Sequence, residues 1–203
     1  MNTEHEIRFH LSHHMFNRLA SHLDWDEAEE IIDIMMGPHG IESMSSNSWV
    51  IRLRMASQTV RMQFKKRLPD PHEHLEIDVG IDSLPSAIEM LHQMGLKLGL
   101  IIARTRRKTS IDETIVALDD IPCLGHFVEI EGKVPGEFHV PTALTEYLAS
   151  HDECKTYGDL IIERLRNEPA WADGYRTASM SAINHLQLGL SFNLMEAGWL
   201  TPQ

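Results

Sequence analysis

Charged side chains recur at a spacing of two residues in several short segments of this 203-residue chain, and some of these pairs are acidic while others are basic. Carboxylate oxygens suit Mg²⁺ and Mn²⁺ as ligands, whereas guanidinium and ammonium groups bind phosphate oxygens. Brought together, they would suit a polyanion bound with divalent cations. The acidic residues are Glu4, Glu6, Glu76, Asp78, Asp119, Glu129 and Glu131, and the basic ones are Arg8, Arg52, Arg54, Lys65, Arg104 and Arg106.

Apolar residues alternate with these charges, as in Arg52-Leu53-Arg54 and Glu129-Ile130-Glu131. Because successive side chains of a β-strand point to opposite faces, such a segment places its charges on one face and its apolar residues on the other. The pattern therefore predicts strands with one charged face. We predict seven of them, at residues 3–11, 48–56, 59–67, 73–81, 98–107, 113–119 and 126–132.

Two arrangements of these strands are compatible with the pattern. In an open antiparallel sheet, the charged face would lie in water, with cross-strand ion pairs worth roughly 0.2–1 kcal/mol each. Alternatively, seven strands in hairpin-like succession can close into a barrel, which removes exposed edges. The charges would then lie inside, where they are costly unless they are paired or neutralised by a ligand.

The remaining segments are mainly helical. We predict helices at residues 13–23, 83–95, 141–150 and 156–166. Residues 24–47 give no clear element, because Gly37, Pro38 and Gly40 interrupt them. The last 37 residues, from Asn167, look helical and rich in apolar and aromatic residues. Their apolar surface must cover the strands or meet a second subunit, and a homodimer is one way to bury it.

The composition limits the function classes. A formal net charge of −12 argues against general nucleic-acid binding, yet 10 of the 18 Lys and Arg residues fall within residues 52–67 and 104–108. The two cysteines imply no disulfide framework. The N-terminus is not a signal segment, and the apolar run at 98–103 is too short to span a bilayer. We therefore expect a cytoplasmic protein without a membrane anchor.

Several motifs in order resemble one known superfamily. They are Glu4-x-Glu6-x-Arg8, Arg52-x-Arg54, Lys65, Glu76-x-Asp78, Arg104-x-Arg106 and the stretch from Leu118-Asp119 through Gly125-His126-Phe127-Val128-Glu129-Ile130-Glu131. Together they are similar to the CYTH, or triphosphate tunnel metalloenzyme, superfamily, and most similar to its class IV adenylate cyclase branch. The resemblance covers about residues 3–165.

The resemblance implies an α+β fold with a closed antiparallel barrel of about eight strands forming a charged tunnel. Helices would pack outside, residues 1–166 would form the tunnel domain, and residues 167–203 would form a helical C-terminal extension. It also implies roles for individual residues. Arg52, Arg54, Lys65, Arg104 and Arg106 would bind a triphosphate, Glu4, Glu6, Glu76, Asp78, Glu129 and Glu131 would hold Mg²⁺ or Mn²⁺, and Arg8, Lys65 and Asp119 would be catalytic.

Three functions remain open. The first is a cyclase that converts ATP to cyclic AMP and pyrophosphate. The second is a hydrolase of tripolyphosphate, thiamine triphosphate or another triphosphate. The third is a non-catalytic module for phosphorylated ligands, favoured because Arg8 replaces a family lysine thought to help activate the attacking oxygen, and arginine is a poor proton acceptor. A zinc site among the 13 histidines is disfavoured, because spacing places at most two on one face. Tyr157 is interpreted as a packing residue.

Overall fold

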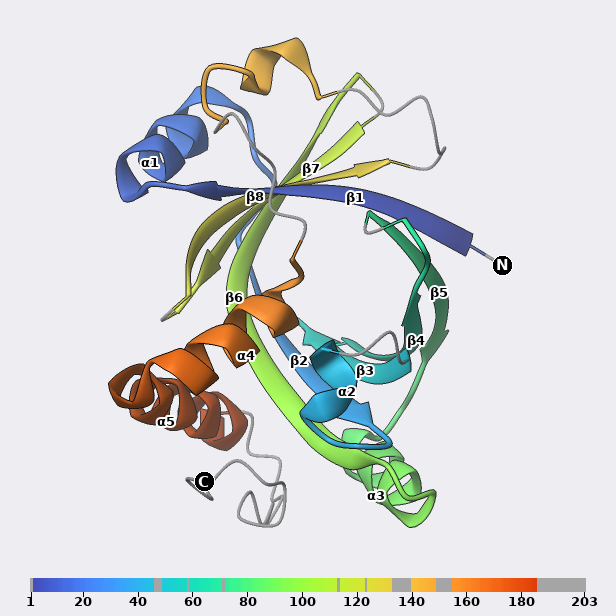
Figure 1. Cartoon of the computed structure of the whole chain (residues 1–203). Coiled ribbons are helices and arrows are strands. Elements are labelled where there is room, and N and C mark those ends of the chain that lie inside the picture. Colours follow the sequence, from blue (N-terminus) through green and yellow to red (C-terminus); the bar gives the residue numbers. More distant parts are fainter. Residues whose placement is uncertain are drawn as a thin grey trace.

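The computed structural model of the protein describes residues 2–45, 49–57, 59–70, 72–112, 114–122, 124–132, 140–148 and 155–185. Eight antiparallel strands form a closed barrel in the order β1-β5-β4-β3-β2-β6-β7-β8, with helices outside it (Figure 1). The predicted closed barrel and α+β class are therefore confirmed. The strands are β1 (Asn2–Leu11), β2 (Glu29–Gly37), β3 (Trp49–Ala56), β4 (Thr59–Arg67), β5 (Glu73–Gly80), β6 (Lys97–Ile111), β7 (Thr114–Ile121) and β8 (Gly125–Gly132).

Strand register aligns the charged residues on the inner face of the barrel. β1 pairs with β8 so that Arg8 lies opposite Glu129 and Glu6 lies opposite Glu131. The alternate residues of β1, such as Phe9, face outward and pack with α1 (His13–His22) in an apolar cluster. The period of two in the sequence thus separates an external apolar core from an internal polar lining.

Strand β2 was not predicted, although it closes the barrel between β3 and β6. It begins at Glu29 and runs through Ile31 and Ile32 to Gly37, with Asp33 as the charged residue among its apolar positions. The Gly37, Pro38 and Gly40 residues that made this region difficult to assign lie at and just beyond the end of the strand. A mainly apolar strand with one buried acid lacks the alternating charges that revealed the others.

Most predicted helices are present. They are α1, capped by Ser12, α3 (Leu84–Gln93), α4 (Tyr157–Asn167) and α5 (Pro169–His185), joined by a short α2 (Glu42–Ser45). The predicted helix at 141–150 was wrong, because its described part holds only the 3₁₀ turn Thr142–Leu144. Residues 186–203 of the predicted extension lie outside the described residues. Within the described ranges, no helix is long and apolar enough to cross a membrane.

Helix α5 covers a free edge of strand β6. β6 pairs with β7 only from Thr105 onward, and further back the Tyr175 hydroxyl donates to the Ile101 carbonyl at 2.7 Å and accepts from its N–H at 3.3 Å. Figure 1 shows α4 and α5 together beside this long strand. Tyr175 therefore substitutes for a neighbouring strand at this point.

We expect Tyr175→Phe to lower the free energy of unfolding by about 1–3 kcal/mol, because it leaves a buried N–H and carbonyl without their partner. Urea denaturation followed by circular dichroism measures this. An unchanged urea midpoint in the variant would mean that α5 contributes to stability through apolar packing alone.

Candidate active site

A cavity of about 720 Å³, part of it open to solvent, runs into the barrel. Among the described residues, seven arginine or lysine side chains and three carboxylates line it. These ten charged residues come from six of the eight strands, and the start of α4 also contributes to the cavity wall. The basic residues are Arg8, Arg52, Arg54, Lys65, Arg67, Arg104 and Arg106, and the acidic ones are Glu6, Asp33 and Glu129. Four further carboxylates, Glu76, Asp119, Glu131 and Asp159, pair with the lining arginines.

Asp33 on β2 balances two arginines at once. Arg54 donates to both of its oxygens at 2.8 and 2.9 Å, and Arg104 donates to Oδ2 at 2.9 Å. Burial opposes ionisation of Asp33, but the charges of Arg54 and Arg104 hold the pKa of this carboxyl far below its usual range. Two guanidinium groups on one carboxylate leave an excess of positive charge.

Arg104 is not fully satisfied by the protein. Within the described part of the chain, its Nε atom is buried without a hydrogen-bond partner, and the Asp119 oxygen nearest to it lies 3.8 Å away. Burial lowers the pKa of Arg104, and the neighbouring charges of Arg106 and Arg54 act in the same direction. Such a donor in an electropositive cavity is suited to an anionic ligand.

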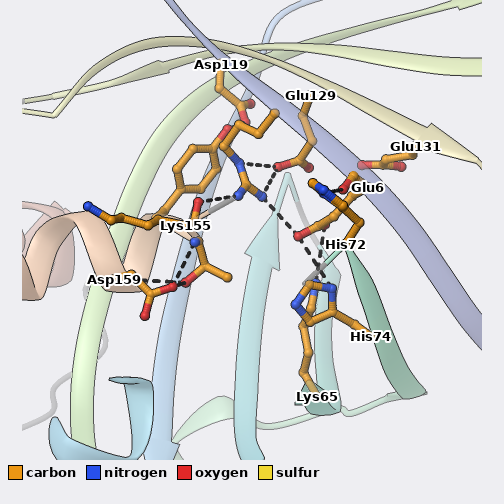
Figure 2. A network of polar contacts seen from close by, with 12 residues as sticks. Glu6, Lys65, His72, His74, Asp119, Glu129, Glu131, Lys155 and Asp159 are labelled. Atoms are coloured by element: carbon orange, nitrogen blue, oxygen red, sulfur yellow. Dashed lines mark hydrogen bonds and ion pairs between the residues drawn. The ribbon is translucent and has the colours of Figure 1, made fainter. Parts of the chain in front are cut away.

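Arg8 brings two carboxylates together. Its Nη2 atom lies 3.0 Å from Glu6 Oε1 and 2.5 Å from Glu129 Oε2, and Nη1 donates to the Lys155 carbonyl at 2.9 Å. Burial opposes the charged form of Arg8, but Glu129 and Glu6 raise its pKa well above the ordinary value. Arg8 therefore cannot accept a proton at neutral pH. Figure 2 shows Glu6 and Glu129 converging in this network.

Arg106 is held by carboxylates. It forms two 2.6 Å hydrogen bonds with Asp119 and further bonds with Glu129 at 2.9 Å and Glu131 at 3.2 Å. Tyr157 also donates to Asp119, at 2.7 Å, and its ring lies 4.2 Å from the Arg8 guanidinium carbon. Tyr157, interpreted from sequence as a packing residue, is therefore also part of the polar network.

The other predicted site residues are distributed unevenly. Glu76 pairs with Arg52 at 2.5 Å, and Lys65 lies 3.5 Å from Glu6. Asp78 is exposed and bonded to Arg61 at 2.8 Å, away from the cavity lining. Glu4 lies on β1, but its side chain falls outside the described part of the structure.

His74 on β5 lines the same cavity and was not predicted as a site residue. It is 2% exposed, and its Nδ1 atom lies 3.7 Å from Glu6 Oε1 (Figure 2). Burial and the positive charge of Lys65 lower the pKa of His74 to about 4. Its ring is therefore neutral at neutral pH. Its place two residues before Glu76, on the same strand face, was the available sequence signal.

The carboxylates have the chemistry of a divalent cation site, although among the described residues no three His, Cys, Asp or Glu side chains are already arranged around one point as metal ligands. Glu6 and Glu129 offer oxygens that contact the same positively charged nitrogen of Arg8. Burial and the nearby charge of Glu129 raise the pKa of Glu131, which shows that negative charge is crowded there. Carboxylate oxygens gathered in this way are the kind of ligand that Mg²⁺ and Mn²⁺ prefer.

The comparisons with known proteins place the barrel in a family. Residues 2–164 match the CYTH domain, and the chain therefore belongs to the CYTH domain family. No curated protein matches it.

Solved structures share the fold. The PH1819 protein of Pyrococcus horikoshii OT3 superposes with a TM-score of 0.67 and 24% identity, covering 79% of this chain and 99% of that one. A proposed adenylate cyclase from Vibrio parahaemolyticus superposes with a TM-score of 0.57 and 18% identity, covering 79% of this chain and 98% of that one. A second proposed adenylate cyclase, from Bacillus halodurans, superposes with a TM-score of 0.58 and 16% identity, covering 75% of this chain and 96% of that one.

Proposed function

We propose that this protein is a divalent-metal-dependent enzyme that binds the triphosphate of its substrate in the barrel tunnel. We favour the conversion of ATP to cyclic AMP and pyrophosphate. The observation that carries the proposal is the set of seven basic side chains that line the cavity among the described residues, two of which, Arg54 and Arg104, share the single carboxylate of Asp33. They are concentrated in a chain whose formal net charge is −12. A cavity so charged, and concave enough to enclose a ligand, selects a compact polyanion.

The phosphate-binding side chains in this proposal are basic residues of the cavity wall, Arg52, Arg54, Lys65 and Arg104. Arg104 has its Nε atom unused, and Arg54 shares Asp33 with it. Arg52 contacts Glu76 and Gln63, and Lys65 contacts Glu6, on the cavity wall. Arg106 instead orients Glu129 and Glu131, because its donors are engaged by carboxylates. Planar guanidinium groups suit phosphate because they can donate two parallel hydrogen bonds.

Glu6, Glu129 and Glu131 would hold Mg²⁺ or Mn²⁺, with Arg8 releasing part of its contact to Glu6 and Glu129. When bound, such an ion neutralises charge on phosphate oxygens. The protein contributes mainly positioning, because phosphoryl transfer through a loose transition state requires little covalent chemistry from side chains. This is why a barrel without a proton acceptor at residue 8 can still act as a catalyst.

The cyclase is favoured over the hydrolase by the resemblance of residues 117–131 to the class IV adenylate cyclase branch. A triphosphatase acting on tripolyphosphate or thiamine triphosphate uses the same phosphate contacts and remains the second candidate. A non-catalytic module is the third, and it is favoured by the raised pKa of Arg8, because an arginine held as a cation cannot activate an attacking oxygen.

The deciding experiment incubates the protein with ATP and, separately, with tripolyphosphate, each with Mg²⁺, with Mn²⁺ or with EDTA, and identifies products by phosphorus NMR. We expect pyrophosphate and cyclic AMP from ATP, only when metal is present. Release of orthophosphate without cyclic AMP would establish a hydrolase. Binding of either compound without turnover under every metal condition would establish a binding module.

We also propose that residues 167–203 are accessory to this chemistry. The family match ends at residue 164, and among the described residues after 167 none lines the cavity. A chain ending at Asn167 should keep its metal-dependent turnover per folded molecule but unfold at lower temperature, or change from dimer to monomer in light scattering. A stable, unchanged assembly without activity would place part of the site in the extension.

A further inference from the structure

His74 is a buried polar side chain whose partner the described protein does not provide. It is 2% exposed on the cavity wall, and neither of its ring nitrogens has a hydrogen-bond partner among the described residues. Buried polar groups are almost always satisfied, so an exception of this kind indicates a water, an ion or a ligand. The neighbours of His74 restrict the choice.

Its geometry suits a shared metal ion better than a hydrogen bond to the carboxylate. Nδ1 lies 3.7 Å from Glu6 Oε1, which is too long for a hydrogen bond. Bonds from a divalent ion to nitrogen or oxygen are about 2.0–2.2 Å, so two ligands of one ion lie roughly 2.8–4.2 Å apart. The observed separation falls within that range. His74 and Glu6 therefore face each other at a spacing that one cation could bridge.

We propose that His74 ligates the divalent ion together with Glu6, and that this nitrogen ligand makes the tunnel site prefer Mn²⁺ to Mg²⁺. The inference rests on the proposed function, which places a divalent ion in the tunnel. Mg²⁺ requires oxygen ligands, whereas transition-metal ions accept an imidazole nitrogen. An imidazole nitrogen that carries no proton has a lone pair to offer to such an ion.

Two cations compete with the ion for Glu6. Lys65 Nζ lies 3.5 Å from Glu6 Oε2, and Arg8 Nη2 lies 3.0 Å from Oε1. Binding of the metal must displace part of these contacts, and a bound triphosphate gives both side chains a new anionic partner. The two ligands, metal and triphosphate, should therefore bind cooperatively.

The test uses Mn²⁺ alone as the probe and does not depend on turnover. Electron paramagnetic resonance of free Mn²⁺ gives the dissociation constant, competition gives that of Mg²⁺, and electron spin-echo modulation detects a coordinated ¹⁴N. In the wild-type protein we expect ¹⁴N modulation. In His74→Gln we expect its loss, with Mn²⁺ affinity about tenfold weaker and Mg²⁺ affinity nearly unchanged.

The matched control is His13→Gln, which changes a histidine that contacts His126 on the outside of the barrel. It should keep both the modulation and the affinity. His74→Leu, which buries no polar group, is the second variant in case Gln at this position does not fold. Bound Mn²⁺ without ¹⁴N modulation in the wild type, or modulation that survives both substitutions, would overturn the role of His74 and leave the proposed function intact. No Mn²⁺ binding at all would overturn both.

Discussion

Replacing Asp33 with asparagine should lower the free energy of unfolding by about 3–5 kcal/mol, the cost of leaving buried charges without their partner. Asp33 is 2% exposed and is the shared carboxylate of Arg54 and Arg104. Its neutralisation would leave two guanidinium groups facing each other inside the barrel. Urea denaturation measures the loss.

Asp78→Asn is the control for that result. Asp78 also pairs with an arginine, Arg61, but the pair is largely exposed. An exposed pair contributes only about 0–1 kcal/mol, so this variant should unfold close to the wild type. Equal losses in the two variants would contradict the assignment of Asp33 as the central counter-ion of the tunnel.

A polyphosphate should rescue the Asp33→Asn protein. Tripolyphosphate binds only the folded tunnel and so stabilises it by mass action. In the variant it also replaces the missing negative charge, so the rise in melting temperature should exceed that of the wild type. A smaller rise would mean that Asp33 orders the arginines for the ligand instead of competing with it.

The pH dependence of the free energy of unfolding, in wild type and in Asp33→Asn, follows from the direction in which folding shifts the pKa of Asp33. Its folded-state pKa is lowered from the ordinary value of 3.8, so the unfolded chain binds more protons at acidic pH. The stabilisation from Asp33 is therefore present above about pH 4 and is lost as the pH falls below it. The difference in stability between wild type and Asp33→Asn should shrink over that acidic range.

The alternating pattern predicted most of the barrel because charge and apolarity report the strand face directly. Arg52-Leu53-Arg54 can satisfy an external apolar core and an internal polar lining in only one register. Strand β2 carries no such alternation, because its outward and inward positions are both largely apolar. Asp33 was missed with it, since a single acid in an apolar run gives no spacing to interpret.

The pairing of side chains across the tunnel could not be predicted from sequence. Residues 8 and 129 are 121 positions apart, and their contact depends on how β1 and β8 are aligned when the barrel closes. Asp78 shows the limit of the pattern, because it shares a strand with His74 and Glu76 but lies beyond the buried part of that strand. The alternating pattern predicts which face of the sheet a side chain occupies. It does not predict how deep in the tunnel that side chain lies.

Replacing Arg104 with methionine should reduce turnover by about 10²–10³-fold, the effect of removing one preorganised donor from a charge-stabilising site. Arg104 is 5% exposed, and its Nε atom is a buried donor that the described protein leaves unsatisfied. Removing it leaves Asp33 paired with Arg54, so no carboxylate is stranded. Folding should therefore be preserved, and the burial cost that lowers the pKa of Arg104 would be relieved.

Two comparisons separate a phosphate-binding role of Arg104 from a structural one. Arg61→Met removes an arginine at the exposed end of the barrel and should leave turnover unchanged. Arg104→Lys keeps the charge but loses the planar fork, so it should recover only part of the lost activity. Tripolyphosphate affinity, measured by calorimetry, should fall in Arg104→Met with the melting temperature of the free protein unchanged or raised. Normal affinity with reduced stability would instead make Arg104 a structural counter-ion of Asp33, and the triphosphate would have to bind elsewhere in the tunnel.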